Sequence, residues 1–171
     1  AIATLPTRSY TISGFTKPAG NNADGATVSS TSTLTSTYTF NGWYKESGAT
    51  NKIASNAATP ALQASTSYTD ANSKWTYTTA SAITLYAGWT SQAKTLPTIT
   101  KTGYTCGWTT TSTGATTIKY ASGGSLTPSA NITLYGVCVA NPYTLTVNPN
   151  GGSFNGSTST TTYTQDFGTL K

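Results

Sequence analysis

The stretch ITLYAGW at residues 83–89 decides the fold, because it returns later in the chain as ITLYGVC at residues 132–138. A second block, YTFNGW at 38–43, returns as YTCGW at 104–108, one residue shorter. Polar and apolar residues alternate within these blocks, with the period of two that is typical of half-buried β-strands. The blocks therefore predict strands that occur twice in the chain.

The order of the blocks is also repeated. The stretch TLPT at residues 4–7 returns at 95–98, and YTISGF at 10–15 is read as a weaker copy of the YTFNGW block. Each full unit then runs from TLP through the YT block to the ITLY block. A fixed order of this kind predicts a repeat protein.

The large residues that recur in the blocks are the expected core. Such side chains bury the most apolar surface per residue. The first unit is expected to contribute Tyr38, Phe40, Trp43, Leu85, Tyr86 and Trp89, with Tyr104, Trp108, Leu134 and Tyr135 as counterparts in the second.

Composition favours β structure and weighs against two classes of function. The 171 residues include 40 Thr, and only 8% of the chain is charged. Branched and aromatic side chains pack well on a pleated surface, so an all-β protein is expected. The net charge of +5 comes from single Lys and Arg residues without a basic cluster, which weighs against nucleic acid as a partner. No apolar run approaches the roughly 20 residues of a membrane span.

Residues for catalysis are scarce. The chain has no His, and its acids are Asp24, Glu46, Asp70 and Asp166, far apart in sequence. A pair such as Glu46 and Asp70 facing each other across a cleft stays open as an alternative. Solvated surface acids are the simpler interpretation. We expect no enzyme, no catalytic residue, no metal site and no cofactor.

The end of the chain predicts a β-hairpin. In YTLTV at residues 143–147, Tyr, Leu and Val alternate with Thr, and TTTYT at 160–164 is the expected returning strand. The sequence Asn150-Gly151-Gly152 supplies a turn between them, because glycine accepts a positive φ angle.

The order of these motifs resembles the Listeria–Bacteroides repeat, also called the internalin B-repeat. The resemblance is carried by residues 143–152, Gly168-Thr169-Leu170, 38–43 and 85–89. It implies extracellular modules of bacterial surface proteins with a β-grasp-like fold and no catalytic residues. The chain is therefore expected to be secreted or to lie at the bacterial cell surface.

The expected organisation is a set of tandem, small, β-grasp-like repeat units. The first covers residues 1–91 with an inserted loop or hairpin at about 54–78, the second covers 92–140, and a half-repeat hairpin covers 141–171. The chain thus starts within one repeat and ends within another. Because each end of the sequence then contains only part of a repeat, we expect either head-to-tail self-association into a filament or contact with neighbouring repeats of a longer chain. The expected function is a cell-surface spacer, fibre subunit or adhesin.

Two cysteines occupy corresponding places in the repeat. Cys138 aligns with Trp89, and Cys106 aligns with either Phe40 or Asn41, depending on where the gap is placed. Two cysteines in a chain of secreted character favour a disulfide, worth roughly 3–4 kcal/mol in the loop-entropy account. Two buried free thiols are the alternative.

The aromatic residues Trp75 and Tyr77 lie in the insertion, outside the repeat pattern. Their rings could stack on sugars, which makes a glycan- or protein-binding module the alternative function. Local packing under the inserted loop is the simpler interpretation of the same residues. A host or cell-surface glycan or protein is the corresponding alternative partner.

Overall fold

The computed structural model describes residues 4–169, and nearly all of its regular structure is β. The chain forms two compact units. Unit 1 comprises residues 4–11, 34–94 and 127–131. Unit 2 comprises residues 12–33, 95–126 and 132–169. Residues 1–3 and 170–171, at the two ends of the predicted repeat units, lie outside the described residues.

The strands are short, as expected for a chain rich in turn-forming residues. Unit 1 contains β3 (Leu34–Thr37), β4 (Thr39–Tyr44), β5 (Lys52–Ala54) and β6 (Tyr86–Thr90). Strands β1 (Ser9–Thr16) and β7 (Lys94–Thr95) run from unit 1 into unit 2. Unit 2 contains the 3-10 turn η1 (Ala19–Asn21), β2 (Thr27–Val28), β8 (Ile99–Thr100), β9 (Tyr104–Thr109), β10 (Tyr120–Ala121), β11 (Ser125–Leu126), β12 (Ile132–Ala140), β13 (Pro142–Val147) and β14 (Thr161–Asp166).

Unit 1 is built on a three-stranded sheet with the order β5-β4-β6. The two repeat blocks supply β4 and β6, which pair antiparallel with Phe40 opposite Trp89. The ladder shifts between Phe40 and Gly42, so Asn41 is the extra residue of a β-bulge. The ring centroid of Phe40 lies 5.3 Å from that of Trp43 and 5.6 Å from that of Trp89, so these three rings pack together.

The insertion between β5 and β6 forms turns rather than a regular hairpin ladder. Residues 55–85 contain only bridge residues in the β conformation, Leu62 opposite Ala54 and Thr69 opposite Trp75. The second bridge closes a tight turn in which Asp70 accepts backbone hydrogen bonds from Asn72 and Lys74 at 2.8 and 2.9 Å. An aspartate that binds the backbone ahead of it is a typical turn signal.

Unit 2 contains the larger core. Its central sheet has the order β10-β9-β12-β1, with β12 antiparallel to β9 and parallel to β1. The fully buried side chains include Trp108 and Phe15, whose rings meet edge to face at 5.1 Å. Ile12 and Leu134 are also fully buried, so the face shared by β1, β9 and β12 forms the core.

The segment YTISGF at residues 10–15 does not pair as a copy of the YTFNGW block would. The true copies, β4 and β9, lie antiparallel to the ITLY strands, whereas β1 lies parallel to β12 with Ile12 opposite Ile132. The interpretation as a copy of the YTFNGW block is therefore wrong. In the sheet order, β1 lies between β12 and β3.

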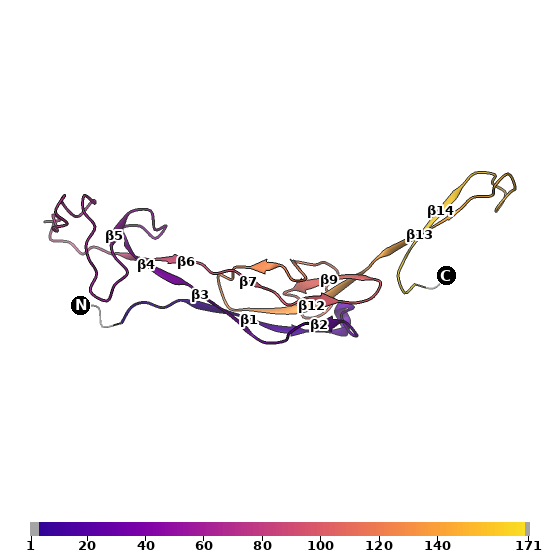
Figure 1. Ribbon diagram of the computed structural model, residues 1–171, viewed down its shortest axis with the longest axis horizontal. Coiled ribbons are helices and arrows are strands. Elements are labelled where there is room, and N and C mark those ends of the chain that lie inside the picture. The colour runs from indigo at the N-terminus through magenta and orange to yellow at the C-terminus, as the bar shows by residue number, and fades with distance from the viewer. Residues whose placement is uncertain (1–3, 170–171) are drawn as a thin grey trace. The chain divides into compact units, whose positions relative to one another are not determined.

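The predicted C-terminal hairpin is confirmed. Strands β13 and β14 pair antiparallel from Pro142 opposite Asp166 to Val147 opposite Thr161. They form a two-stranded sheet of their own, drawn in orange to yellow in Figure 1. Asn150 and Gly151 have φ angles of 47° and 88°, as the turn sequence predicted.

The expected core is confirmed for several of its members and wrong for one. Phe40, Trp108 and Leu134 are buried, and the other residues of the set are half-buried except for Tyr86. Tyr86 is 42% exposed at the start of β6. Period-two spacing marks a strand but does not say which of two adjacent residues faces inward.

The two compact units do not coincide with the repeat units predicted from the sequence. Residues 34–94 separate residues 12–33 from the rest of unit 2. The division of the chain at about residues 91 and 140 stays a prediction about the sequence repeat. Among residues 4–169, no helix is long and apolar enough to cross a membrane.

Candidate functional site

The two cysteines are joined in a disulfide on neighbouring strands. Cys106 of β9 lies opposite Cys138 of β12, and their sulfur atoms are bonded. Both residues are nearly inaccessible to solvent. The disulfide therefore ties the two strands at the centre of unit 2, and its role is structural rather than reactive.

The same place in unit 1 is occupied by an aromatic pair. Phe40 lies opposite Trp89, as Cys106 lies opposite Cys138. The bulge at Asn41 accounts for the extra residue in β4, so the alignment of Cys106 with Phe40 is the correct one. The two units thus join equivalent strands by different means, one by ring packing and the other by a covalent bond.

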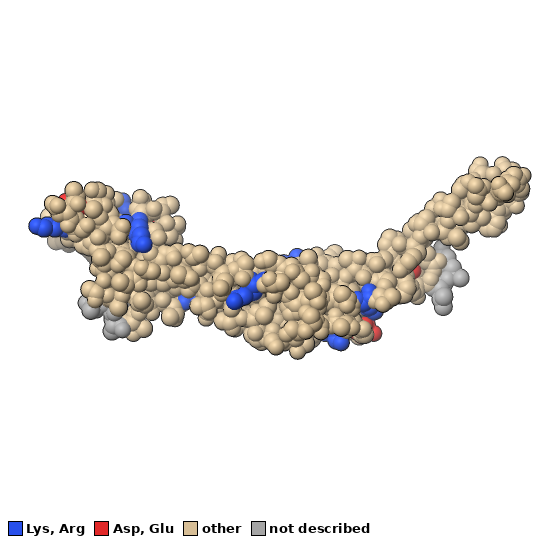
Figure 2. Space-filling view, viewed as in Figure 1, with Lys and Arg blue, Asp and Glu red and all other residues tan. Residues whose placement is uncertain are grey.

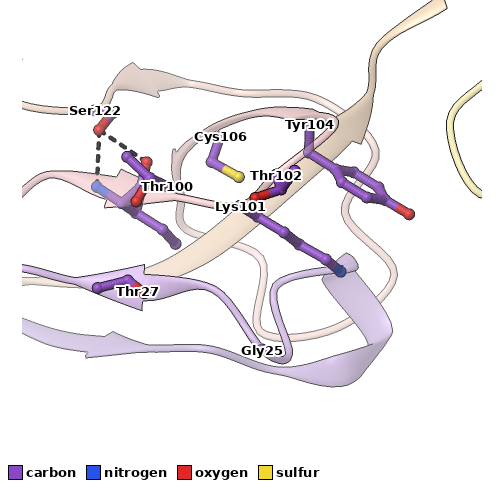
Figure 3. Close-up of a pocket in the computed structure, with 9 residues that line it drawn as sticks. Gly25, Thr27, Thr100, Lys101, Thr102, Tyr104, Cys106 and Ser122 are labelled. Carbon is purple, nitrogen blue, oxygen red and sulfur yellow. Dashed lines mark hydrogen bonds between the residues drawn. The ribbon is translucent and has the colours of Figure 1, made fainter.

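A hollow of about 510 Å³ opens on the surface of unit 2 (Figure 3). Threonines 27, 100 and 102 line it together with Lys101 and Ser122. The Ser122 hydroxyl accepts a hydrogen bond from the backbone N–H of Ile99 at 2.8 Å and donates one to the carbonyl of Ile99 at 3.0 Å, as the dashed lines in Figure 3 show. Ser122 therefore joins loop to strand and is not paired with a general base.

The one ammonium group in this hollow is engaged with its surroundings. Lys101 Nζ donates to the backbone carbonyl of Asn22 at 2.7 Å and lies 3.7 Å from a carboxylate oxygen of Asp24. It also lies 4.3 Å from the centre of the Tyr104 ring, within the range of a cation–π interaction. These contacts fix a loop of unit 2.

The acids also have structural contacts. The pKa of Glu46 is lowered, mainly because the side-chain amide of Asn51 donates a hydrogen bond to its carboxylate. The hydroxyl of Thr50 and the backbone N–H of Asn51 donate to the same carboxylate, so Glu46 closes the β4–β5 turn. Among residues 4–169, no group of three or more His, Cys, Asp or Glu side chains comes together as metal ligands would.

The predicted ligand-binding residues Trp75 and Tyr77 lie together on unit 1. Both rings pack against Tyr68, with centroid distances of 5.6 and 5.4 Å. Trp75 is nevertheless 45% exposed, and the ammonium group of Lys45 lies 5.7 Å from the Tyr68 ring. The cluster therefore packs the inserted loop and leaves part of the Trp75 indole exposed.

The most unusual surface is the apolar face of the C-terminal hairpin. Leu145 is 63% exposed and Tyr143 is 54% exposed, and Tyr163 on β14 lies directly opposite Leu145. Of the eight large hydrophobic side chains that are exposed among residues 4–169, five belong to this hairpin and the residues next to it: Tyr143, Leu145, Phe154, Tyr163 and Phe167. The exposed apolar side chains of the described residues are thus concentrated on one small element.

The hairpin surface is hollowed and almost free of charge. A depression of about 360 Å³ is lined by Tyr143, Leu145, Tyr163 and Phe167. Between residues 142 and 169 the only charged side chain is Asp166. Figure 2 shows this part of the surface almost entirely in tan. A contact here would gain mainly from apolar burial and backbone pairing.

The base of the hairpin is attached to the rest of unit 2. The Phe167 ring lies 5.6 Å from that of Tyr104 and covers Gly103, where a β-carbon would collide with it. The backbone N–H of Asn141 donates to the carbonyl of Gly103 at 2.9 Å. The backbone N–H of Phe167 donates to the carbonyl of Asn141, also at 2.9 Å. These contacts hold the base of the hairpin and leave Tyr143 and Leu145 exposed.

A buried polar residue that the sequence did not single out holds unit 2 together. Asn21 is fully buried, and its amide donates to the carbonyls of Thr111 and Gly136 at 3.0 and 3.2 Å. Its side-chain oxygen accepts a hydrogen bond from the backbone N–H of Ala115 at 2.8 Å. In the sequence, Asn21 is one of two adjacent asparagines in a glycine-rich loop, and nothing there distinguishes it from Asn22.

Comparison with known proteins gives one result. The model of the Listeria-Bacteroides repeat domain matches residues 8–66 and 90–137, which together are more than half of the chain. No curated protein and no solved structure matches. The matched segments contain both copies of the YT block and most of the second ITLY block. The chain belongs to the Listeria-Bacteroides repeat domain family.

Proposed function

We propose that this chain is a structural repeat protein of the bacterial cell surface, a spacer or fibre subunit that assembles head to tail through its C-terminal hairpin. The observation that carries the proposal is the exposed apolar face around Tyr143 and Leu145. The family is typical of bacterial surface proteins, and the disulfide between Cys106 and Cys138 suits an oxidising compartment outside the cytoplasm.

An isolated two-stranded hairpin is marginally stable in water. The hairpin β13–β14 has a row of unpaired backbone groups at each edge and a solvated apolar face. Exposed strand edges of this kind pair readily with another chain. A contact between this hairpin and a different surface of the next subunit is heterologous, and it propagates into a filament unless the rotation closes a ring.

The proposal assigns no catalytic activity to the chain. It relies on the absence of His from the whole sequence and on the structural contacts made by Glu46, Lys101 and Ser122. Adhesion is the second part of the proposal, since a fibre of repeat modules positions binding surfaces away from the cell.

The test is light scattering and electron microscopy of the whole chain over a range of concentrations. The variant Tyr143→Ser/Leu145→Ser removes the apolar face at two exposed positions and should leave unit 2 folded. We expect the native chain to form linear assemblies and this variant to stay monomeric.

The matched control is Val139→Ser/Trp75→Ser, which removes two large apolar side chains that are exposed elsewhere, at 40% and 45%. This control should assemble as the native chain does. A native chain that stays monomeric at millimolar concentration would show that the hairpin is not an assembly surface.

A second candidate function rests on the aromatic cluster of unit 1. The exposed Trp75 ring beside Tyr68 and Tyr77 is a surface on which a sugar ring could stack, and it supports a glycan- or protein-binding module. A glycan array with the native chain and Trp75→Ala tests it. Binding that is lost in Trp75→Ala supports this function, and an array without binding removes the glycan form of it.

A further inference from the structure

The two ITLY strands of this protein have different numbers of neighbours. In unit 2, β12 lies between β9 and β1, and β1 adds to it in parallel with Ile12 opposite Ile132. Among the described residues of unit 1, β6 is the edge of its sheet and pairs with β4 alone. The parallel neighbour that β12 has is therefore missing beside β6 within residues 4–169.

The burial of equivalent residues agrees with a missing neighbour. Leu134 is fully buried on β12, whereas its equivalent Leu85 is only half-buried. The strand β12 begins at Ile132, but β6 begins three residues later in the repeat, at Tyr86. Residues 83–85, which precede β6, are the repeat equivalents of residues 132–134, and residues 132–134 pair with β1 in unit 2.

In the C-terminal hairpin, β13 resembles β1 but has no ITLY strand beside it among residues 4–169. The sequence Tyr143-Thr144-Leu145 of β13 corresponds to Tyr10-Thr11-Ile12 of β1. Ile12 is 0% exposed because β1 lies beside β12, whereas Leu145 is 63% exposed on a strand that pairs with β14 alone. Among the described residues, β13 thus lacks the ITLY strand that β1 has beside it. The ITLY strand β6 lacks the parallel strand that β12 has beside it.

We infer that β13 of one copy of this chain adds in parallel to the edge of β6 in a second copy, with Leu145 opposite Ile83. The register follows from the pairing of Ile12 with Ile132, because Leu145 is equivalent to Ile12 and Ile83 to Ile132. The added strand extends β6 toward its N-terminal side and covers Leu85. The inference rests on the proposed head-to-tail assembly and names the two strands that form its contact.

Charge and shape agree with this partner. The two paired strands of the hairpin carry one charge, that of Asp166, whereas unit 1 carries five Lys or Arg residues and two Asp or Glu residues. A hollow of about 480 Å³ lies against β6, lined by Arg8, Tyr86 and Trp89 among others. Opposite net charges aid the encounter of the two surfaces.

Disulfide trapping between two variants tests the pairing. A chain with Ile83→Cys is mixed with a chain with Leu145→Cys under mild oxidation, and the product is identified by mass and by non-reducing electrophoresis. Residues opposite each other on paired strands are close enough for a disulfide. We expect a cross-linked heterodimer of the two variants, and none when Val139→Cys replaces Leu145→Cys as the exposed partner.

A single substitution gives a quantitative measure of the same contact. Leu145→Asp should raise the dissociation constant of assembly at least about tenfold, because an apolar residue at the contact becomes charged. Val139→Asp, at an exposed position outside the hairpin, should leave the dissociation constant within about twofold of the native value.

The remaining outcomes would each overturn the inference. Cross-linking of Leu145→Cys to itself would show that two hairpins pair with each other. A chain that carries both cysteines and cross-links only within itself, while the mixed variants do not react, would place the hairpin on its own unit 1. Assembly that is abolished by Tyr143→Ser/Leu145→Ser without trapping at residue 83 would leave the proposed function intact and refute this strand pair.

Discussion

Removal of the Trp108 side chain should be among the most destabilising changes in this protein. The indole is completely buried, its ring contacts Phe15 at 5.1 Å, and its Nε1 donates to the carbonyl of Pro97 at 2.8 Å. A buried Trp truncated to Ala costs about 3–5 kcal/mol. The carbonyl of Pro97 also loses one of its two donors, the other being the backbone N–H of Gly123, so we expect Trp108→Ala to lie toward the upper end, about 5 kcal/mol.

Two matched changes separate ring packing from the hydrogen bond. Trp108→Phe keeps an aromatic ring but leaves the carbonyl of Pro97 with only the backbone N–H of Gly123 as a donor, and should cost about 1–3 kcal/mol. Trp43→Phe should cost less, because the Nε1 of Trp43 is buried without a hydrogen-bond partner and its removal relieves an unsatisfied donor.

The assay is denaturant unfolding followed by circular dichroism, with Trp75→Ala as the control for an exposed indole. That control should cost less than about 1 kcal/mol. If Trp108→Ala destabilises the protein no more than Trp75→Ala does, the assignment of Trp108 to the core of unit 2 is refuted.

Three further changes test other parts of the structure. Replacing Cys106 and Cys138 by Ser should lower the free energy of unfolding by about 3–4 kcal/mol, since the bond closes a loop with a sequence separation of 32; an unchanged melting temperature would contradict this. Asn21→Ala removes three hydrogen bonds made by a fully buried side chain and should cost about 3 kcal/mol, measured by the same denaturant unfolding. The lowered pKa of Glu46, caused first by Asn51, means that its stabilisation is full above its ordinary pKa of 4.5 and is lost as pH falls through the lower folded pKa. The melting temperature of Glu46→Gln should therefore vary less with pH in that acid range than that of the native chain, and parallel curves would refute it.

The family and the strand content could be predicted because they depend on local patterns. Alternation of apolar residues with Thr is visible in any strand that has one buried face, and the recurrence of ITLY identifies equivalent strands. The cysteine pair followed from the same comparison, since residues at equivalent places in a repeat occupy equivalent places in the ladder. The hairpin was predictable because Asn150 and Gly151 take the positive φ angles that its turn requires.

Pairing between distant segments was decided only by the tertiary structure. The sequence of β1 resembles the YT block, but its parallel place beside β12 depends on residues more than a hundred positions away. The same applies to Asn21, whose three partners come from residues 111–136. A buried polar side chain is recognised by the groups that surround it, and local sequence does not contain them.

The contrast between Ile12 and Leu145 shows this limit most directly. Both follow Tyr-Thr in a strand of the same pattern, yet one is completely buried and the other is 63% exposed. The sequence determined by itself that each is the apolar residue of a half-buried strand. Only the tertiary structure decided which strand has a neighbour, because burial depends on the surface that packs against a residue and not on the residue alone.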